Sequence, residues 1–344
     1  MHSSRIKLYR LQRGLSRKEV AAKTGISLAM LTLFEDGKRT PDNKTARILA
    51  SVLGITYPQL MKFVPSERKY QHGEFRKQST LSKSAQGYLQ MLIEEYFDRL
   101  FLVADLLGGK VLRASPAMHS LVTDNSPEAD AMALRDYWGF ARSGPILSLI
   151  DVLENKGILI CKIPYQHTDF SGINGMADRH PYIAINSYAT PERQRSTLIH
   201  ELVHVSFEQP AQTSREYEKY IEAVSGAFLL PKPDAFAELG RKRRAVSSDM
   251  SIVAQEYGIS LQMLAKRAQQ LEIISNGAYR NFNIAINRAG IRTSEGGRID
   301  IEETRLLEQL VLRALSEEKI SMSRAAELLD VPYHIMRDKF ELWN

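Results

Sequence analysis

Residues 190–231 read TPERQRSTLIHELVHVSFEQPAQTSREYEKYIEAVSGAFLLP, and the rest of the chain is organised around this stretch. It contains the pentapeptide His200-Glu201-Leu202-Val203-His204. Residues four apart lie on one face of a helix, so the imidazoles of His200 and His204 can share one tetrahedral Zn2+ ion. Glu201 lies beside them and can act on a water molecule at the metal. The stretch therefore predicts a catalytic zinc site.

The helix that carries the motif has a recognisable start and an apolar setting. Thr190 is the expected cap, and Pro191 stands at the first helical position, where a missing backbone N–H costs little. The alternative interpretation is two histidines and a glutamate on an ordinary surface helix. Apolar residues around the motif favour a buried helix instead, and they are Leu198, Ile199, Leu202, Val203 and Val205.

A third metal ligand must come from another element. The helix expected at about 214–230 offers Glu216, Glu218 and Glu222. Glu218 and Glu222 are four apart and share a face. One of them can bind the metal while the other orients a ligating imidazole. From the residues alone, either assignment stands.

Length and composition exclude several classes of protein. A chain of 344 residues predicts two or three domains. No apolar run approaches the roughly 20 residues of a membrane span, and the N-terminus MHSSRIKLYR lacks the apolar core of a signal peptide. We expect a cytoplasmic protein that does not bind membranes. The single cysteine, Cys161, excludes an internal disulfide framework and is expected to be a buried thiol.

The charge is distributed unevenly along the chain. Residues 1–80 hold 16 Lys and Arg against 6 Asp and Glu, whereas the remaining residues hold 30 against 34. A basic surface that only aids solubility would not explain this segregation. It is typical of an appended module that binds nucleic acid.

The spacing of caps and glycines in this basic segment predicts a helix-turn-helix. Ser16 and Glu19 form a capping box, and Gly25 supplies the following turn. Ser27 caps a short second helix, and another helix is expected at roughly 42–53. In a helix-turn-helix the second helix, called the recognition helix, enters the major groove of DNA.

Residues 4–62 resemble the Cro/CI-like helix-turn-helix family, also called Xre, which implies a five-helix domain. The recognition helix at residues 27–34 lacks the Gln, Asn and Arg side chains that usually contact base edges. Two roles of this domain therefore remain open. It can bind DNA, or it can dock a protein or form a homodimer. The matching motifs are Gly14-Leu15-Ser16, Glu19-Val20-Ala21, Gly25-Ile26-Ser27, Glu35-Asp36-Gly37 and Arg39-Thr40-Pro41. The candidate DNA contacts are Arg17, Lys18, Ser27, Lys38, Arg39 and Lys44.

The rest of the chain predicts an α+β fold that is mostly α. Two strands, at 158–163 and 182–186, are expected to form a small sheet that leads into the motif helix, with a polar segment between them. Helix pairs with helix-turn-helix spacing are expected at 248–272 and 302–342, as packing or substrate-docking elements. The predicted division is a helix-turn-helix domain (1–63), a linker and packed helix (64–126), a zincin-like metallopeptidase domain (127–235) and a C-terminal helical domain with helix-turn-helix-like units (236–344).

Residues 74–275 resemble the ImmA/IrrE family of zinc metallopeptidases. In that family a ligating Glu stands thirteen residues before the Pro of a Phe-Leu-Leu-Pro-like signature. Here that position is Glu218, and Glu222 remains the alternative because the helix departs from the family pattern at Val224 and Gly226. The motifs that carry the resemblance are Arg135 with Trp138-Gly139, Gly144-Pro145-Ile146, Ser171-Gly172, Ile183-Ala184-Ile185-Asn186, Arg195 with His200–His204, and Gly226–Pro231.

The resemblance implies a zinc endopeptidase of narrow specificity. Members of the family cleave a partner repressor, in response to DNA damage or another signal, and so relieve repression of mobile-element, stress or defence genes. Members with their own helix-turn-helix also occur beside toxins, as antitoxin-like regulators. The competing hypotheses are a DNA-binding regulator or antitoxin whose metal site is secondary or inactive, and a scaffold that only binds partners.

Overall fold

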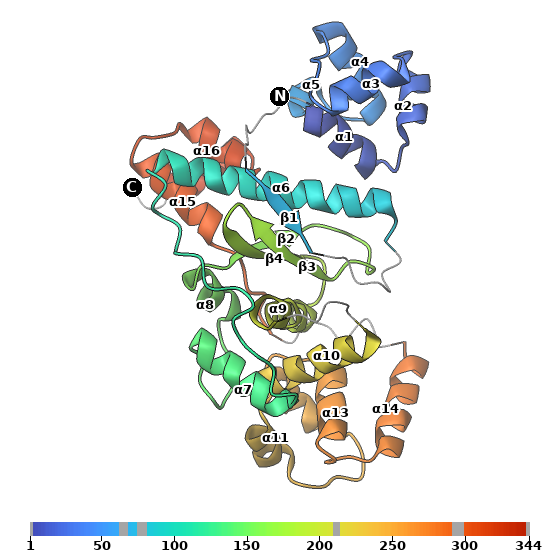
Figure 1. Cartoon of the computed structure of the whole chain (residues 1–344), viewed down its shortest axis with the longest axis vertical. Helices are drawn as coiled ribbons and strands as arrows, with labels where there is room; N and C mark the ends of the chain where they lie inside the picture. Colours follow the sequence, from blue (N-terminus) through green and yellow to red (C-terminus); the bar gives the residue numbers. More distant parts are fainter. Residues whose placement is uncertain (1–2, 62–67, 74–80, 209–213, 291–298, 342–344) are drawn as a thin grey trace. The chain divides into compact units, whose positions relative to one another are not determined.

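The computed structural model describes residues 3–61, 68–73, 81–208, 214–290 and 299–341. The described chain is mostly helical, with a few short strands, which confirms the predicted class (Figure 1). It divides into two compact units. Unit 1 combines residues 1–112 with 306–344, and unit 2 comprises residues 113–305.

The helix-turn-helix domain begins unit 1. The predicted capping box is present at α2, where Ser16 Oγ accepts the backbone N–H of Glu19 and the Glu19 carboxylate accepts that of Ser16. Gly25 adopts a φ of 71°, which favours glycine, and the chain turns there into the next helix. The five helices are α1 (Ser3–Gln12), α2 (Arg17–Thr24), α3 (Leu28–Glu35), α4 (Asn43–Leu53) and α5 (Tyr57–Met61). Their core includes Ile6, Val20, Leu31, Phe34, Leu49 and Leu53.

The remainder of unit 1 consists of a strand and a long helix that follow the helix-turn-helix domain and three helices that follow unit 2 in the sequence. The long helix α6 packs against α1 and also against α15, which follows unit 2 in the sequence. The Arg99 guanidinium of α6 donates to the carbonyl oxygen of Leu328 at 2.8 Å. The elements are β1 (Tyr70–His72), α6 (Lys83–Leu106), α15 (Leu306–Ser316), α16 (Met322–Leu329) and α17 (Tyr333–Glu341).

Three strands form the sheet of unit 2. The fully buried β4 (His180–Asn186) pairs in parallel with β2 (Leu159–Ile163) and antiparallel with β3 (Gly172–Ala177). The predicted strands at 158–163 and 182–186 correspond to β2 and β4. The strand β3 lies in the polar segment between them and was not predicted. Its alternate buried positions are Ile173, Gly175 and Ala177. Gly175 and Ala177 are small and carry too little hydrophobic signal to reveal the two-residue period of a strand.

The motif helix α9 (Pro191–Ser206) packs across β3 and β4 on one side and against α10 (Arg215–Leu229) on the other. Thr190 caps α9 as predicted, by accepting the N–H of Arg193, and Pro191 occupies the first turn. The remaining helices of the unit are α7 (Pro127–Trp138), α8 (Leu149–Asn155), α11 (Lys232–Leu239), α12 (Met250–Glu256), α13 (Leu261–Gln270) and α14 (Asn276–Arg288).

A buried arginine fixes α9 within unit 2. The Arg195 guanidinium donates to the carbonyl oxygens of Ile146 at 2.6 Å and Gly258 at 3.2 Å, and it also pairs with the carboxylate of Glu302. The second oxygen of Glu302 accepts the N–H of Ile150 at the start of α8. The segment just before α15 is therefore attached to both α9 and α8.

Candidate metal centre

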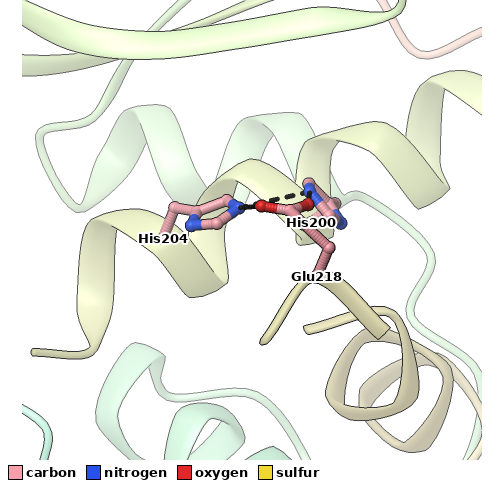
Figure 2. A group of neighbouring side chains, drawn as sticks. All are labelled: His200, His204 and Glu218. Carbon is pink, nitrogen blue, oxygen red and sulfur yellow. Dashed lines mark hydrogen bonds and ion pairs between the residues drawn. The ribbon is translucent and has the colours of Figure 1, made fainter. Parts of the chain in front are cut away.

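Helices α9 and α10 bring three potential metal ligands together (Figure 2). His200 and His204 lie one turn apart on α9 and are buried, with their Nε2 atoms 3.2 Å apart. Glu218, in the first turn of α10, places Oε2 at 3.3 Å from His200 Nε2 and Oε1 at 3.7 Å from His204 Nε2. In Figure 2 the carboxylate points toward both rings.

The spacing and chemistry of these atoms fit a zinc ion. Ligands bound at the usual zinc distances in a tetrahedral site lie roughly 3.3 Å from one another. Two imidazole nitrogens and one carboxylate oxygen form the donor set of many catalytic sites, which leave a fourth position for water or substrate. Within the ranges that the structure describes, this is the group of His, Cys, Asp and Glu side chains close enough to hold an ion together.

Glu222, the alternative ligand, lies one turn further along α10. Its side chain is exposed, and it does not belong to the cluster of ligand atoms. The geometry therefore favours Glu218 over Glu222 as the third ligand.

Glu201 is buried beside the two histidines, with 6% of its surface exposed. The Asn174 side-chain amide on β3 donates a hydrogen bond of 2.7 Å to Glu201 Oε2. This bond holds one oxygen of the carboxylate, Oε2, and so orients the side chain. Asn174 could not be selected from the sequence, because its role depends on the pairing of β3 with β4.

The strand β3 approaches α9 closely because residue 172 is glycine. A Cβ atom at this position would lie 2.5 Å from Thr197 Cγ2, 2.9 Å from the carbonyl oxygen of Ala184 and 3.6 Å from Glu201 Cγ. Any larger residue would push the strand away from the motif. Gly172 thus sets the distance across which Asn174 reaches Glu201.

Tyr217 adds a further polar group next to the cluster. Its ring centroid lies 5.8 Å from that of His204. Among the described residues its buried hydroxyl has no hydrogen-bond partner. Burial, and then the charge of Glu218, raise the pKa of Tyr217 to about 12. The hydroxyl is consequently a protonated donor at neutral pH.

The six candidate DNA contacts fall into two groups. Arg17 Nε donates to the buried carboxylate of Glu35 at 2.6 Å, and Ser27 Oγ caps α3 by accepting the N–H of Met30. These two side chains already bond within the domain. The other four side chains are exposed, and they are Lys18, Lys38, Arg39 and Lys44. Of these, Lys38 Nζ lies 3.8 Å from Asp36 Oδ2 in a surface ion pair.

Both predicted resemblances are confirmed by comparison with known families. Residues 153–269 match the Peptidase M78 family, described as the IrrE N-terminal-like domain, and residues 6–60 match a helix-turn-helix family. The first match lies within unit 2 and the second within unit 1. The chain therefore combines a helix-turn-helix domain with an IrrE/ImmA-like peptidase-family domain.

A relative in Bacillus subtilis (strain 168) points the same way for one part of the chain. It is described as an uncharacterized HTH-type transcriptional regulator, YqaE, and is 32% identical over 71 residues. The match covers 21% of this chain and 61% of that protein, which is less than two thirds of its length.

No described helix is both long and apolar enough to cross a membrane.

Proposed function

We propose that this protein is a zinc-dependent endopeptidase of narrow specificity that cleaves a partner repressor or antitoxin-like regulator. Such cleavage would control the expression of stress, mobile-element or defence genes in the cytoplasm. The observation that carries the proposal is the convergence of His200, His204 and Glu218, with Glu201 buried next to them. A zinc ion with a purely structural role would not require a glutamate at that position.

The residues of the site divide the chemical work between them. His200, His204 and Glu218 would hold Zn2+, which when bound lowers the pKa of a coordinated water molecule toward neutrality. Glu201 accepts a proton from the water that attacks the peptide carbonyl and passes it to the departing amine. Asn174 holds Oε2 of that carboxylate and so fixes the orientation of the proton acceptor.

The helix-turn-helix domain supports the regulatory part of the proposal. A protein that binds DNA near a repressor meets that repressor at a high local concentration. The exposed Lys18, Lys38, Arg39 and Lys44 supply positive charge for contacts with phosphates. Narrow specificity follows if the substrate is selected by this shared location as well as by its sequence.

A second candidate function is a DNA-binding regulator or antitoxin in which the peptidase site is secondary or inactive. The helix-turn-helix match and the regulator from Bacillus subtilis favour it. The two candidates differ in one respect that can be measured, because only the peptidase depends on Glu201.

The test is a cleavage assay with the repressor or antitoxin encoded beside the gene. The purified protein and its Glu201→Gln variant would each be incubated with that partner, in the presence and absence of duplex DNA, and the products followed by intact mass spectrometry. We expect one defined cut by the wild type and none by the variant, with equal zinc contents. If the wild type binds an operator yet never cleaves the partner, the regulator is the correct assignment.

A further inference from the structure

The recognition helix α3 presents an apolar face to solvent. Leu28 and Leu33 are 43% and 36% exposed, and Ala29 between them is also exposed. The hydroxyl of the N-cap Ser27 and that of Thr32 each make a local hydrogen bond. Ser27 Oγ accepts the N–H of Met30, and Thr32 Oγ1 donates to the carbonyl oxygen of Leu28 at 2.9 Å.

The domain that carries this apolar face also exposes positive charge, part of which is paired with Asp36 directly after α3. Exposed cations stand at the start of α2 (Lys18), directly after α3 (Lys38 and Arg39) and in the first turn of α4 (Lys44). Residues 1–61 hold 11 Lys and Arg against 4 Asp and Glu. One of these acids, Glu35, is buried between Arg10 and Arg17, so its charge is neutralised inside the domain.

Each base pair that contains thymine displays a C5-methyl group in the major groove, and apolar side chains recognise that group by contact. We propose that α3 distinguishes its DNA site mainly by packing Leu28, Ala29 and Leu33 against thymine methyl groups, while exposed cations of the same domain hold the phosphates. This inference rests on the DNA binding proposed above and names the base feature that is read. The excess of basic residues in this domain favours a polyanion over a protein or a second copy of the chain as the occupant of this face.

Uracil substitution tests the proposal, because uracil differs from thymine only in lacking the methyl group. The full-length protein would select its preferred duplex from a random-sequence pool. Each thymine of that duplex would then be replaced in turn by deoxyuridine, and the affinity measured at fixed salt. Burial of one methyl group corresponds to about a fourfold change in affinity. We expect losses of about that size at two or more neighbouring thymines.

Substitutions in the protein identify the side chains that make the contacts. Leu33→Ala and Leu28→Ala should weaken binding to the thymine duplex and abolish the difference between thymine and uracil at the contacted positions. Ile48→Ala is the matched control, because Ile48 is 38% exposed in the same domain but lies on α4. That variant should keep the discrimination of the wild type.

The alternatives give different results. Equal affinity for thymine and uracil duplexes would overturn the inference and leave DNA binding intact. Leucine variants that change the oligomeric state but keep the discrimination would show that the apolar face binds protein instead. Failure to bind any duplex would overturn both this inference and the DNA-binding role.

Discussion

At the scale of single residues, the proposed zinc site depends on a carboxylate from outside the motif. We expect Glu218→Ala to lose zinc, because only two protein ligands remain, so that dialysed protein contains about a tenth of the wild-type zinc or less. Glu222→Ala serves as the matched control, since Glu222 is on the same helix but outside the cluster. The Glu222→Ala variant should only weaken zinc binding. The zinc content of both variants is measured by plasma mass spectrometry. The reverse pattern would assign the third ligand to Glu222, one turn further along α10.

The bond between Asn174 and Glu201 permits a second test on one side chain. Asn174→Ala should lower kcat about tenfold or more, because the carboxylate is no longer held in a single orientation. KM and zinc content should stay near their wild-type values, because Asn174 is not a ligand. Steady-state kinetics on the cleaved partner measure the effect. An unchanged kcat would mean that Asn174 has no role in positioning.

The motif itself could be predicted because its geometry is local. The four-residue spacing of His200 and His204 guarantees a shared helix face wherever the helix lies. The residues alone left Glu218 and Glu222 as equal choices, because they do not show how α10 meets α9, and the family resemblance selected Glu218 with Glu222 as the alternative. Asn174 and Tyr217 were missed, because each depends on packing between elements that are distant in sequence.

At the scale of secondary-structure elements, the close contact of β3 with α9 makes Gly172 a sensitive position. Gly172→Ala should destabilise the protein by about 1–3 kcal/mol, because the added Cβ would overlap Thr197 and the Ala184 carbonyl. Urea unfolding followed by circular dichroism measures the change. Gly226→Ala on α10 is the control, because its Cβ would find its nearest neighbour at 3.8 Å. It should leave stability within about 1 kcal/mol of wild type, on the stabilising side.

The strand β3 also shows where element prediction fails. Cap residues revealed α2 and α9 because those signals lie within a few residues of one another. The β3 segment has two glycines and gains its structure from pairing with β4, so its own sequence carries little preference.

The ion pair of Arg195 and Glu302 attaches α9 to the segment just before α15. Glu302→Ala should destabilise the protein by about 3 kcal/mol, because it leaves the buried Arg195 guanidinium without its counter-charge. The exposed pair of Asp136 and Arg142 provides the comparison. Asp136→Ala should leave the midpoint of urea unfolding essentially unchanged. Equal effects of the two substitutions would contradict a special role for Glu302.

At the scale of the whole molecule, the two matched families occupy different compact units, so their functions should be separable by mutation. Replacing both Lys38 and Arg39 with alanine should weaken binding to every duplex. It should also reduce the slope of log affinity against log salt concentration by about one for each phosphate contact removed. Zinc content and cleavage of a free peptide substrate should be unaffected. Glu201→Gln should do the opposite, removing cleavage while duplex affinity stays at its wild-type level. Fluorescence anisotropy at several salt concentrations would reveal any departure from this pattern.

Unit 1 is discontinuous in sequence, and this has a consequence for how the protein is made. Translation produces α6 well before α15, and all of unit 2 emerges from the ribosome between them. The side of α6 that contacts α15 stays uncovered throughout that interval. Unit 2 can therefore finish folding first, during synthesis, whereas unit 1 can close only after its last helices have been released.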